Sequence, residues 1–418
     1  MQNSSRWPAP ALARRILLGL VVLAAATLSY SPTSAAVVSA TSTYGLLTTY
    51  PNTTPHVDDE FGSAVAWMPS GSQLVVASRS YQLNGTDPVG AVFILNRDSK
   101  LVTQTLHKAV PVANDYFGFS IAVSNTHVLV GAQQDSTFAN RSGAAYLFDA
   151  GTGSLVQTFT NTAGGPNDFF GSSVAFLTDT VLVGAPQYGP PINVGRAYIC
   201  NVVDGSCPTA IDSPTHTDGG FFGLALASLG TTYAVGAPLD GNHGTVYVFS
   251  AATVPVTVTI VPTSSFLDDN FGHALATVGG DILIGAPDDG TGAINAGAAY
   301  LYQPDGTFVR KFVNPDPHVN DLFGSSVAGA GNFVLIGAPQ ANASAGVGYL
   351  FNLTTGALIN TFHKKAPQSG DEFGFSVAVQ GENFLVGAHL DNTGASHAGA
   401  VYRFGVLWNL YLPLIKRH

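Results

Sequence analysis

Aspartates recur at one fixed place along this chain, two residues before a Phe-Gly pair. The members of this series are Asp59, Asp115, Asp168, Asp269, Asp321 and Asp371. The one equivalent position without an acid holds Gly220. Such an aspartate can cap a turn by accepting backbone N–H bonds, or a ring of carboxylates can supply oxygen ligands to metal ions. Identical placement in nearly every repeat favours the turn-capping role, and the metal ring is the alternative.

The sequence contains none of the common catalytic patterns. His-Glu-x-x-His, Gly-x-Ser-x-Gly and phosphate-binding glycine motifs are all missing. His243, His363, His389 and His397 fall in or near predicted loops, where isolated histidines are usually solvated. The sequence therefore predicts no catalytic residue, no metal site and no cofactor, and we expect a protein that is not an enzyme.

The Phe-Gly pairs form the strongest pattern in the chain. Seven copies, spaced by 49 to 56 residues, begin at Phe61, Phe117, Phe170, Phe222, Phe271, Phe323 and Phe373. A fixed period of this size indicates one repeated supersecondary unit. Each unit holds short runs of β-branched and aromatic residues bounded by Gly, Pro, Asn or Asp. That pattern is typical of four strands joined by turns.

Seven units of four strands predict an all-β fold, a seven-bladed β-propeller. The last unit, Phe373–Phe404, supplies only three strands. An apolar residue lies 11 positions before each repeat phenylalanine, and Tyr50 holds this place before Phe61. We therefore expect residues 43–50 to complete the seventh blade by pairing with Gly399–Phe404, which would protect both edges.

Two kinds of residue should be tightly packed in such a ring. We expect the repeat phenylalanines, such as Phe170, Phe271 and Phe323, to be buried between blades. A glycine follows fourteen residues after most of them and usually opens a Gly-Ala-Pro sequence. Neighbouring backbone should crowd these glycines, which include Gly184, Gly285 and Gly337.

These repeats resemble the FG-GAP repeat family, the repeat of the integrin α-subunit propeller, over about residues 41–404. The family repeat often carries a calcium loop, Asp-x-Asp/Asn-x-Asp-Gly, between its first and second strands. The corresponding connections here include Ser124–His127, Leu177–Thr180, Gly279–Asp281 and Gly381–Asn383. They lack the several oxygen ligands that calcium needs. The chain looks like the short, calcium-free bacterial variant of the family, and we do not expect calcium at the family position.

Most acidic residues fall in the predicted fourth-to-first and second-to-third strand connections, which emerge on one face of a propeller. Eighteen of the 26 acids do so: Asp58, Asp59, Glu60, Asp87, Asp115, Asp135, Asp168, Asp218, Asp240, Asp268, Asp269, Asp288, Asp289, Asp316, Asp321, Asp371, Glu372 and Asp391. An acidic face steers cationic partners. We expect Asp288, Asp289, Asp371 and Glu372 to lie on a partner-binding face. The net charge of −10 makes nucleic acid an unlikely partner.

The two ends of the chain differ from the repeats. Residues 1–36 carry Arg14-Arg15, an apolar run over residues 16–26 and small residues at 34–36, which predict a secretory signal. The alternative is an uncleaved anchor, although the run is short for a membrane span. The propeller should cover residues 37–405. The apolar tail, 406–418, should pack on the propeller or act as a surface-retention tag. We expect a secreted or cell-surface protein with no stable membrane span after signal cleavage.

The only cysteines, Cys200 and Cys207, flank a predicted turn between the third and fourth strands of the third blade. Export permits a disulfide, and similar hairpin cysteines occur in integrin-type blades. A disulfide is therefore expected, because two thiols without a nearby histidine supply too few ligands for a metal.

Two classes of function follow from these patterns. The first is an exported, non-catalytic binding or adhesion module that uses the acidic loop face to hold a protein or glycan at the cell surface. The alternative is a secreted propeller enzyme, a hydrolase or lyase, with an unidentified site. Fold alone does not decide between them.

Overall fold

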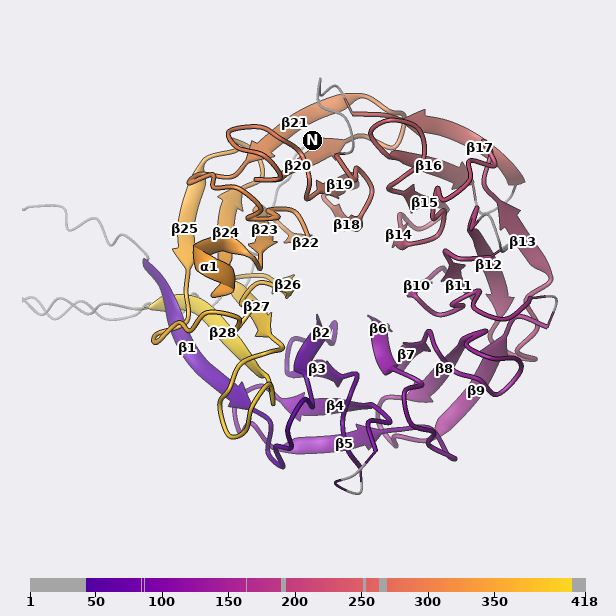
Figure 1. The fold of residues 1–418 in the computed structure, drawn as a ribbon, viewed down its shortest axis with the longest axis horizontal. Helices are drawn as coiled ribbons and strands as arrows, with labels where there is room; N and C mark the ends of the chain where they lie inside the picture. The colour runs from indigo at the N-terminus through magenta and orange to yellow at the C-terminus, as the bar shows by residue number, and fades with distance from the viewer. Residues whose placement is uncertain are drawn as a thin grey trace, which may run out of the picture. The chain divides into compact units, whose positions relative to one another are not determined.

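Seven four-stranded sheets form a closed ring, as Figure 1 shows. The computed structural model describes residues 43–407, apart from residues 84, 86, 163, 189–192, 251, 252 and 263–268. We number the blades I to VII from the sheet that begins with the first Phe-Gly pair. The expected seven-bladed propeller is confirmed. The predicted signal segment 1–36 and most of the predicted tail, 408–418, lie outside the described residues.

In blades I to VI the four strands follow one another in the chain, from the centre of the ring outwards. Blade I contains β2 (Phe61–Trp67), β3 (Gln73–Ser78), β4 (Ala91–Asn96) and β5 (Val102–Leu106). Blade II contains β6 (Phe117–Val123), β7 (His127–Ala132), β8 (Ala144–Asp149) and β9 (Leu155–Thr160). Blade III contains β10 (Ser173–Phe176), β11 (Thr180–Ala185), β12 (Arg196–Asn201) and β13 (Thr209–Asp212). Blade IV contains β14 (Ala225–Ser228), β15 (Thr232–Ala237), β16 (Thr245–Ser250) and β17 (Thr253–Ile260). Blade V contains β18 (Ala274–Val278), β19 (Asp281–Ala286), β20 (Ala298–Tyr302) and β21 (Phe308–Val313). Blade VI contains β22 (Ser326–Ala330), β23 (Phe333–Ala338), β24 (Val347–Asn352) and β25 (Leu358–Phe362). A four-residue segment, α1 (Ala341–Ser344), lies between β23 and β24.

Blade VII closes the ring with strands from both ends of the described chain. It contains β26 (Ser376–Gln380), β27 (Asn383–Ala388) and β28 (Ala400–Leu407), and its outer strand is β1 (Thr43–Pro51). Strands β1 and β28 are antiparallel, with Tyr44 opposite Val406 and Tyr50 opposite Val401. The predicted closure is therefore confirmed. Strand β28 ends at Leu407, so the last blade extends two residues beyond the expected boundary at 405.

Each Phe-Gly pair forms the centre of a tight turn that leads into the innermost strand. In all seven turns the glycine has a φ between 90° and 98°, which only glycine adopts readily. The N–H of the residue after the glycine donates to the C=O of the residue before the phenylalanine, as from Ser63 to Glu60 at 3.1 Å. This is the geometry of a type II turn, whose third position needs a positive φ. The turn explains why the pair recurs in every blade.

The two glycines of the repeat meet where neighbouring blades join. A Cβ atom on Gly184 would lie 2.0 Å from the carbonyl oxygen of Gly223, the Phe-Gly glycine of the next blade. Gly285 and Gly337 are crowded in the same way. Phe170, Phe271 and Phe323 are fully buried, each with 0% exposure. Both packing expectations are confirmed, and the apolar core consists of separate clusters that span neighbouring blades.

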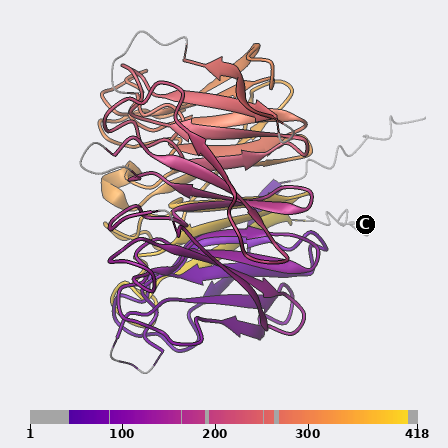
Figure 2. The same cartoon turned by 90° about the vertical axis from the view of Figure 1, so that its right-hand side faces the viewer.

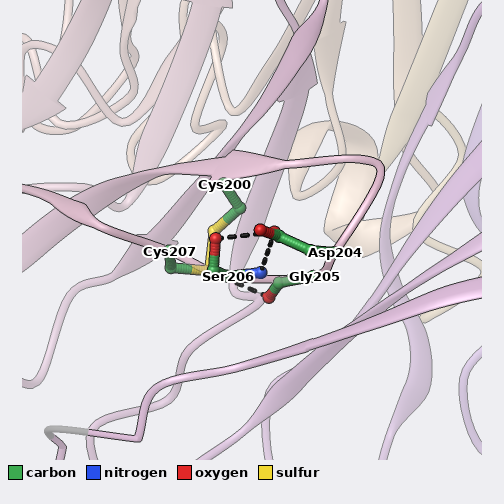
Figure 3. The surroundings of a disulfide bond; sticks show 5 residues. All are labelled: Cys200, Asp204, Gly205, Ser206 and Cys207. Carbon is green, nitrogen blue, oxygen red and sulfur yellow. Dashed lines mark hydrogen bonds between the residues drawn. A yellow bond between two sulfur atoms is a disulfide. The ribbon is translucent and has the colours of Figure 1, made fainter.

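The turn between β12 and β13 carries a disulfide, seen in Figure 3. The bond joins Cys200 and Cys207, as the sequence predicts. Inside the turn, the Oδ1 atom of Asp204 accepts hydrogen bonds from the N–H of Ser206 at 2.9 Å and from its hydroxyl at 2.6 Å. The disulfide and these bonds hold an exposed loop in which Val203 is 84% exposed. Within the described part of the chain, no helix has the length and apolar character needed to cross a membrane.

Candidate functional site

The aspartates that precede the Phe-Gly pairs lie inside the protein. All six are buried, with exposures of 0% to 2%. The Oδ2 atom of Asp321 accepts the backbone N–H of His318 at 2.8 Å, three residues earlier. Asp59, Asp168 and Asp371 each accept the N–H at the same offset. The turn-capping role is therefore confirmed for these positions.

A second series of buried aspartates follows the second strand of four blades. It consists of Asp135, Asp240, Asp289 and Asp391, with exposures of 0% to 3%. Each accepts a hydrogen bond from a tyrosine hydroxyl of the third strand, such as the 2.5 Å bond from Tyr402 to Asp391. The loops therefore hold two layers of carboxylates that face inwards.

Lysines bridge the two layers at two blade junctions. The Nζ atom of Lys108, on entry to blade II, lies 2.6 Å from Asp115 and 2.7 Å from Asp135. The Nζ atom of Lys364, on entry to blade VII, lies 3.0 Å from Asp371 and 2.9 Å from Asp391. We call these two sites the charged junctions. In each of them one cation is shared by two buried carboxylates.

An asparagine replaces the lysine at three other junctions. Asn52, Asn161 and Asn314 donate an amide N–H to Asp59, Asp168 and Asp321 at 2.7, 3.3 and 2.8 Å. We call these sites the amide junctions. Blade III has Tyr188 and blade VI has Ala341 at the place of the second aspartate. At these five junctions, the lysine is found where two carboxylates meet, and the asparagine where the second aspartate is missing.

The charged junction at the entry to blade II shifts the pKa values of its two carboxylates in opposite directions. Burial alone would raise the pKa of Asp135, but hydrogen bonds from Lys108 and other donors hold it below its usual value. The same balance lowers the pKa of Asp391. Burial raises the pKa of Asp115, which accepts fewer hydrogen bonds and faces the charge of Asp135. These patterns belong to a structural network that keeps the loops in place.

The expected exposed acidic face needs correction. Of the acids in this set that the structure describes, ten are buried, among them Asp289 and Asp371. Asp289 binds Lys311 at 2.9 Å, and Asp371 binds Lys364. Asp288 and Glu372 are only partly exposed. Lysines and asparagines cover many of these carboxylates, so the face is less acidic than the number of acids in its loops predicts.

One position on the same face separates the blades into two groups. Directly after the second strand, blades III to VI have Pro186, Pro238, Pro287 and Pro339. Blades VII, I and II have His389, Arg79 and Gln133 instead. These three blades are neighbours in the ring (Figure 1). Repeats keep residues that the fold requires, and departures from the repeat are expected at functional sites.

Arg79 joins side chains from all three of these blades. Its Nε atom donates to Glu60 of blade I. Its guanidinium lies over the ring of Phe119 in blade II at 5.9 Å and over the ring of Phe375 in blade VII at 5.4 Å. Both distances are within the range of cation–π attraction. Arg79 is therefore held by one carboxylate and two aromatic faces.

His389 and Glu372 extend this group on the side of blade VII. The imidazole of His389 is 3% exposed and lies 3.8 Å from the Phe375 ring, centre to centre. Its Nε2 atom is 3.7 Å from Glu372, whose other oxygen accepts a 2.7 Å bond from Gln340. Burial, together with the charge of Arg79, lowers the pKa of His389 to about 3. Burial raises the pKa of Glu372.

We refer to these residues as the three-blade cluster. Its members are Glu60, Arg79, Phe119, Glu372, Phe375 and His389. The side chains of Arg79, Glu60 and Glu372 are 22%, 18% and 19% exposed, so the cluster is partly open to solvent. Of the predicted site residues, only Glu372 belongs to it. The replacement of proline by Arg79 and His389 is visible in the sequence. The residues that all repeats have in common indicate the fold, and they do not point to this difference between blades.

Within the described ranges, no group of three or more His, Cys, Asp or Glu side chains is placed to hold a metal ion.

Comparison with known proteins identifies the repeat. The model of the FG-GAP repeat matches residues 103–148, 154–200, 259–302, 307–351 and 367–404, which is more than half of the chain. The chain therefore belongs to the FG-GAP repeat family, as its repeats indicated. No curated protein matches it.

Proposed function

We propose that this chain is an exported, non-catalytic binding module of the adhesion type. Its partner, a protein or glycan at the cell surface, would dock on the face formed by the fourth-to-first and second-to-third connections. FG-GAP repeats and a disulfide are both consistent with an extracellular setting. The proposal includes the predicted secretory signal at residues 1–36.

One observation carries this proposal, namely the departure of three adjacent blades from the repeat. Arg79 and His389 occupy a position at which the other four blades have proline, and both contact aromatic side chains on this face. Binding residues are commonly carried by loops on a rigid scaffold. Asp288 and Glu372 are partly exposed, and the proposal keeps both on this face. Asp289 and Asp371 support the same loops from inside.

The chemistry of the cluster favours binding over catalysis. A general acid or base works best with a pKa near the operating pH, whereas the pKa of His389 is about 3. Glu60 already accepts a hydrogen bond from the Nε atom of Arg79. A hydrolase or lyase screen on the exported protein tests the alternative, and turnover that is lost on mutation of the three-blade cluster would overturn the proposal.

Two exposed valines allow a direct test of the binding face. Val57 lies in the connection that enters blade I and is 52% exposed, and Val203 lies on the opposite face, in the disulfide-bonded turn, and is 84% exposed. A photo-crosslinking amino acid is placed at each site in turn in the exported protein, which is then applied to intact cells. We expect a specific crosslinked product from position 57 and none from position 203. Crosslinking from 203 alone would assign the wrong face.

A further inference from the structure

Arg79 is fixed on three sides by the protein. Glu60 binds its Nε atom, and the guanidinium lies over the rings of Phe119 and Phe375, at 5.9 and 5.4 Å from the ring centres. Its backbone N–H also donates to the Ser63 hydroxyl at 3.3 Å. A long, charged side chain normally loses much rotamer entropy when it binds a ligand. Arg79 is already ordered before any ligand arrives.

Among the residues that the structure describes, the hydrogen bond from the Arg79 side chain is the one from Nε to Glu60, and neither Nη atom donates a hydrogen bond. The side chain as a whole is 22% exposed. The two Nη groups present parallel N–H donors in one plane, the geometry that matches a carboxylate through two hydrogen bonds.

We infer that Arg79 is a receptor for a single carboxylate group, supplied by an acidic side chain of a protein partner. The inference deepens the proposed function and rests on it for the kind of partner. The negative groups around Arg79 determine which anion can bind. Glu60 and Glu372 lie close to it, and the whole chain carries a net charge of −10. A phosphate group or a polyanionic glycan would be repelled more strongly than one carboxylate.

The remaining exposed acids of the face limit the partner further. Asp58, Asp87, Asp218 and Asp316 are exposed on the loops of this face. A partner surface that is neutral or basic overall would be attracted by them. Such a surface would place one acidic side chain on Arg79.

Arginine Nε–Hε signals in the NMR spectrum of the ¹⁵N-labelled exported protein provide the test. The probe is N-acetyl-aspartate N-methylamide, and its uncharged counterpart is N-acetyl-asparagine N-methylamide. We expect the aspartate probe to shift the Arg79 signal in a saturable way and the asparagine probe to leave it unchanged. Arg79→Gln should abolish saturable binding. Arg79→Lys should weaken it by about fivefold or more, because lysine lacks the planar fork.

Arg196 is the matched control. Its guanidinium lies 3.9 Å from the centre of the Tyr188 ring, but Asp212 already binds both its Nε and Nη2 atoms. Arg196→Gln should therefore leave probe binding unchanged. Thermal unfolding of each variant shows whether it is folded. If Arg79→Gln does not fold, Arg79→Lys, which keeps the positive charge, provides the test.

Three results would overturn the inference: equal shifts from both probes, unchanged aspartate binding in folded Arg79→Gln or Arg79→Lys, or binding of methyl glucuronide without binding of the aspartate probe. The proposed function fails separately. Crosslinking from position 203 alone would show that the partner does not bind the proposed face, even if the aspartate probe still bound Arg79.

Discussion

The entry to blade VI and the entry to blade VII stabilise buried carboxylates in different ways. On entry to blade VII, Lys364 lies between Asp371 and Asp391, and both carboxylates are fully buried. On entry to blade VI, Asn314 donates to Asp321 alone, and Ala341 takes the place of a second acid. Two carboxylates cannot remain ionised together in a dry site without a cation. Of these two junctions, the one that buries two carboxylates has a lysine as donor, and the one that buries a single carboxylate has an asparagine.

Removal of the shared cation should have the largest effect on this comparison. Lys364→Met leaves two buried carboxylates facing each other, and we expect it to lower the free energy of unfolding by about 3–5 kcal/mol. The neighbouring Lys365 is exposed, so Lys365→Met should change stability by no more than about 0.5 kcal/mol. Urea unfolding of both variants measures the difference. Equal losses would mean that Lys364 has no special role.

The amide junction should be less sensitive. Asn314→Leu removes one donor but leaves Asp321 its bond from the His318 N–H at 2.8 Å. We expect a loss of about 1–3 kcal/mol in the free energy of unfolding, the cost of an unsatisfied buried acceptor. Urea unfolding beside Lys364→Met gives the ranking. A larger loss from Asn314→Leu would reverse the proposed order of the two junction types.

A transplant tests whether the two junctions are interchangeable. Lys364→Asn combined with Asp391→Ala gives the entry to blade VII the donor and acid of the entry to blade VI. We expect the double variant to lie within about 1–2 kcal/mol of the original protein, because a buried ion pair contributes little net stability when both partners leave together. Lys364→Asn alone is the control and should be clearly less stable. If the double variant is no more stable than Lys364→Asn alone, Lys364 and Asp391 are not energetically coupled.

Acid titration should distinguish carboxylates whose pKa values shift in opposite directions. The pKa of Asp391 is lowered in the folded protein, so its stabilising effect is present above the unfolded value of about 3.9 and is lost as the pH falls below it. The pKa of Asp115 is raised by burial, so its contribution is greatest below about 3.9 and declines as the pH rises through the folded value. Stability relative to the parent should therefore rise for Asp391→Asn as the pH falls, and rise for Asp115→Asn as the pH rises. Urea unfolding between pH 2.5 and pH 7 measures both, and parallel curves would contradict the assignment.

The repeat pattern predicted the fold well because blade geometry depends on local spacing. The offset of 11 residues placed β1 beside β28, and the Phe-Gly and Gly-Ala glycines marked where blades touch. The buried carboxylates were misplaced because their donors were not considered. Lys108, Lys364 and the junction asparagines all lie seven residues before the aspartate that they bind. That offset is visible in the sequence.

The three-blade cluster was missed for a different reason. Its contacts join blades that are distant in the chain, since Arg79 meets Phe375 almost three hundred positions later. Only the closed ring brings blades VII, I and II together. Sequence comparison could have located the unusual positions, through Arg79 and His389 in place of proline. It could not have shown that these side chains touch.

The smallest effect is expected from metal removal. The carboxylates of the charged junctions already bind Lys108 and Lys364 at 2.6 to 3.0 Å, so these oxygens are occupied by protein donors. A calcium ion would need six to eight oxygen ligands and would have to displace these ammonium groups. We therefore expect EDTA to shift the melting temperature by less than about 1 °C, which for a domain of this size corresponds to a change in stability of less than about 1 kcal/mol. Scanning calorimetry with and without added calcium checks this. A fall of several degrees that calcium reverses would show that metal, rather than lysine, holds these loops together.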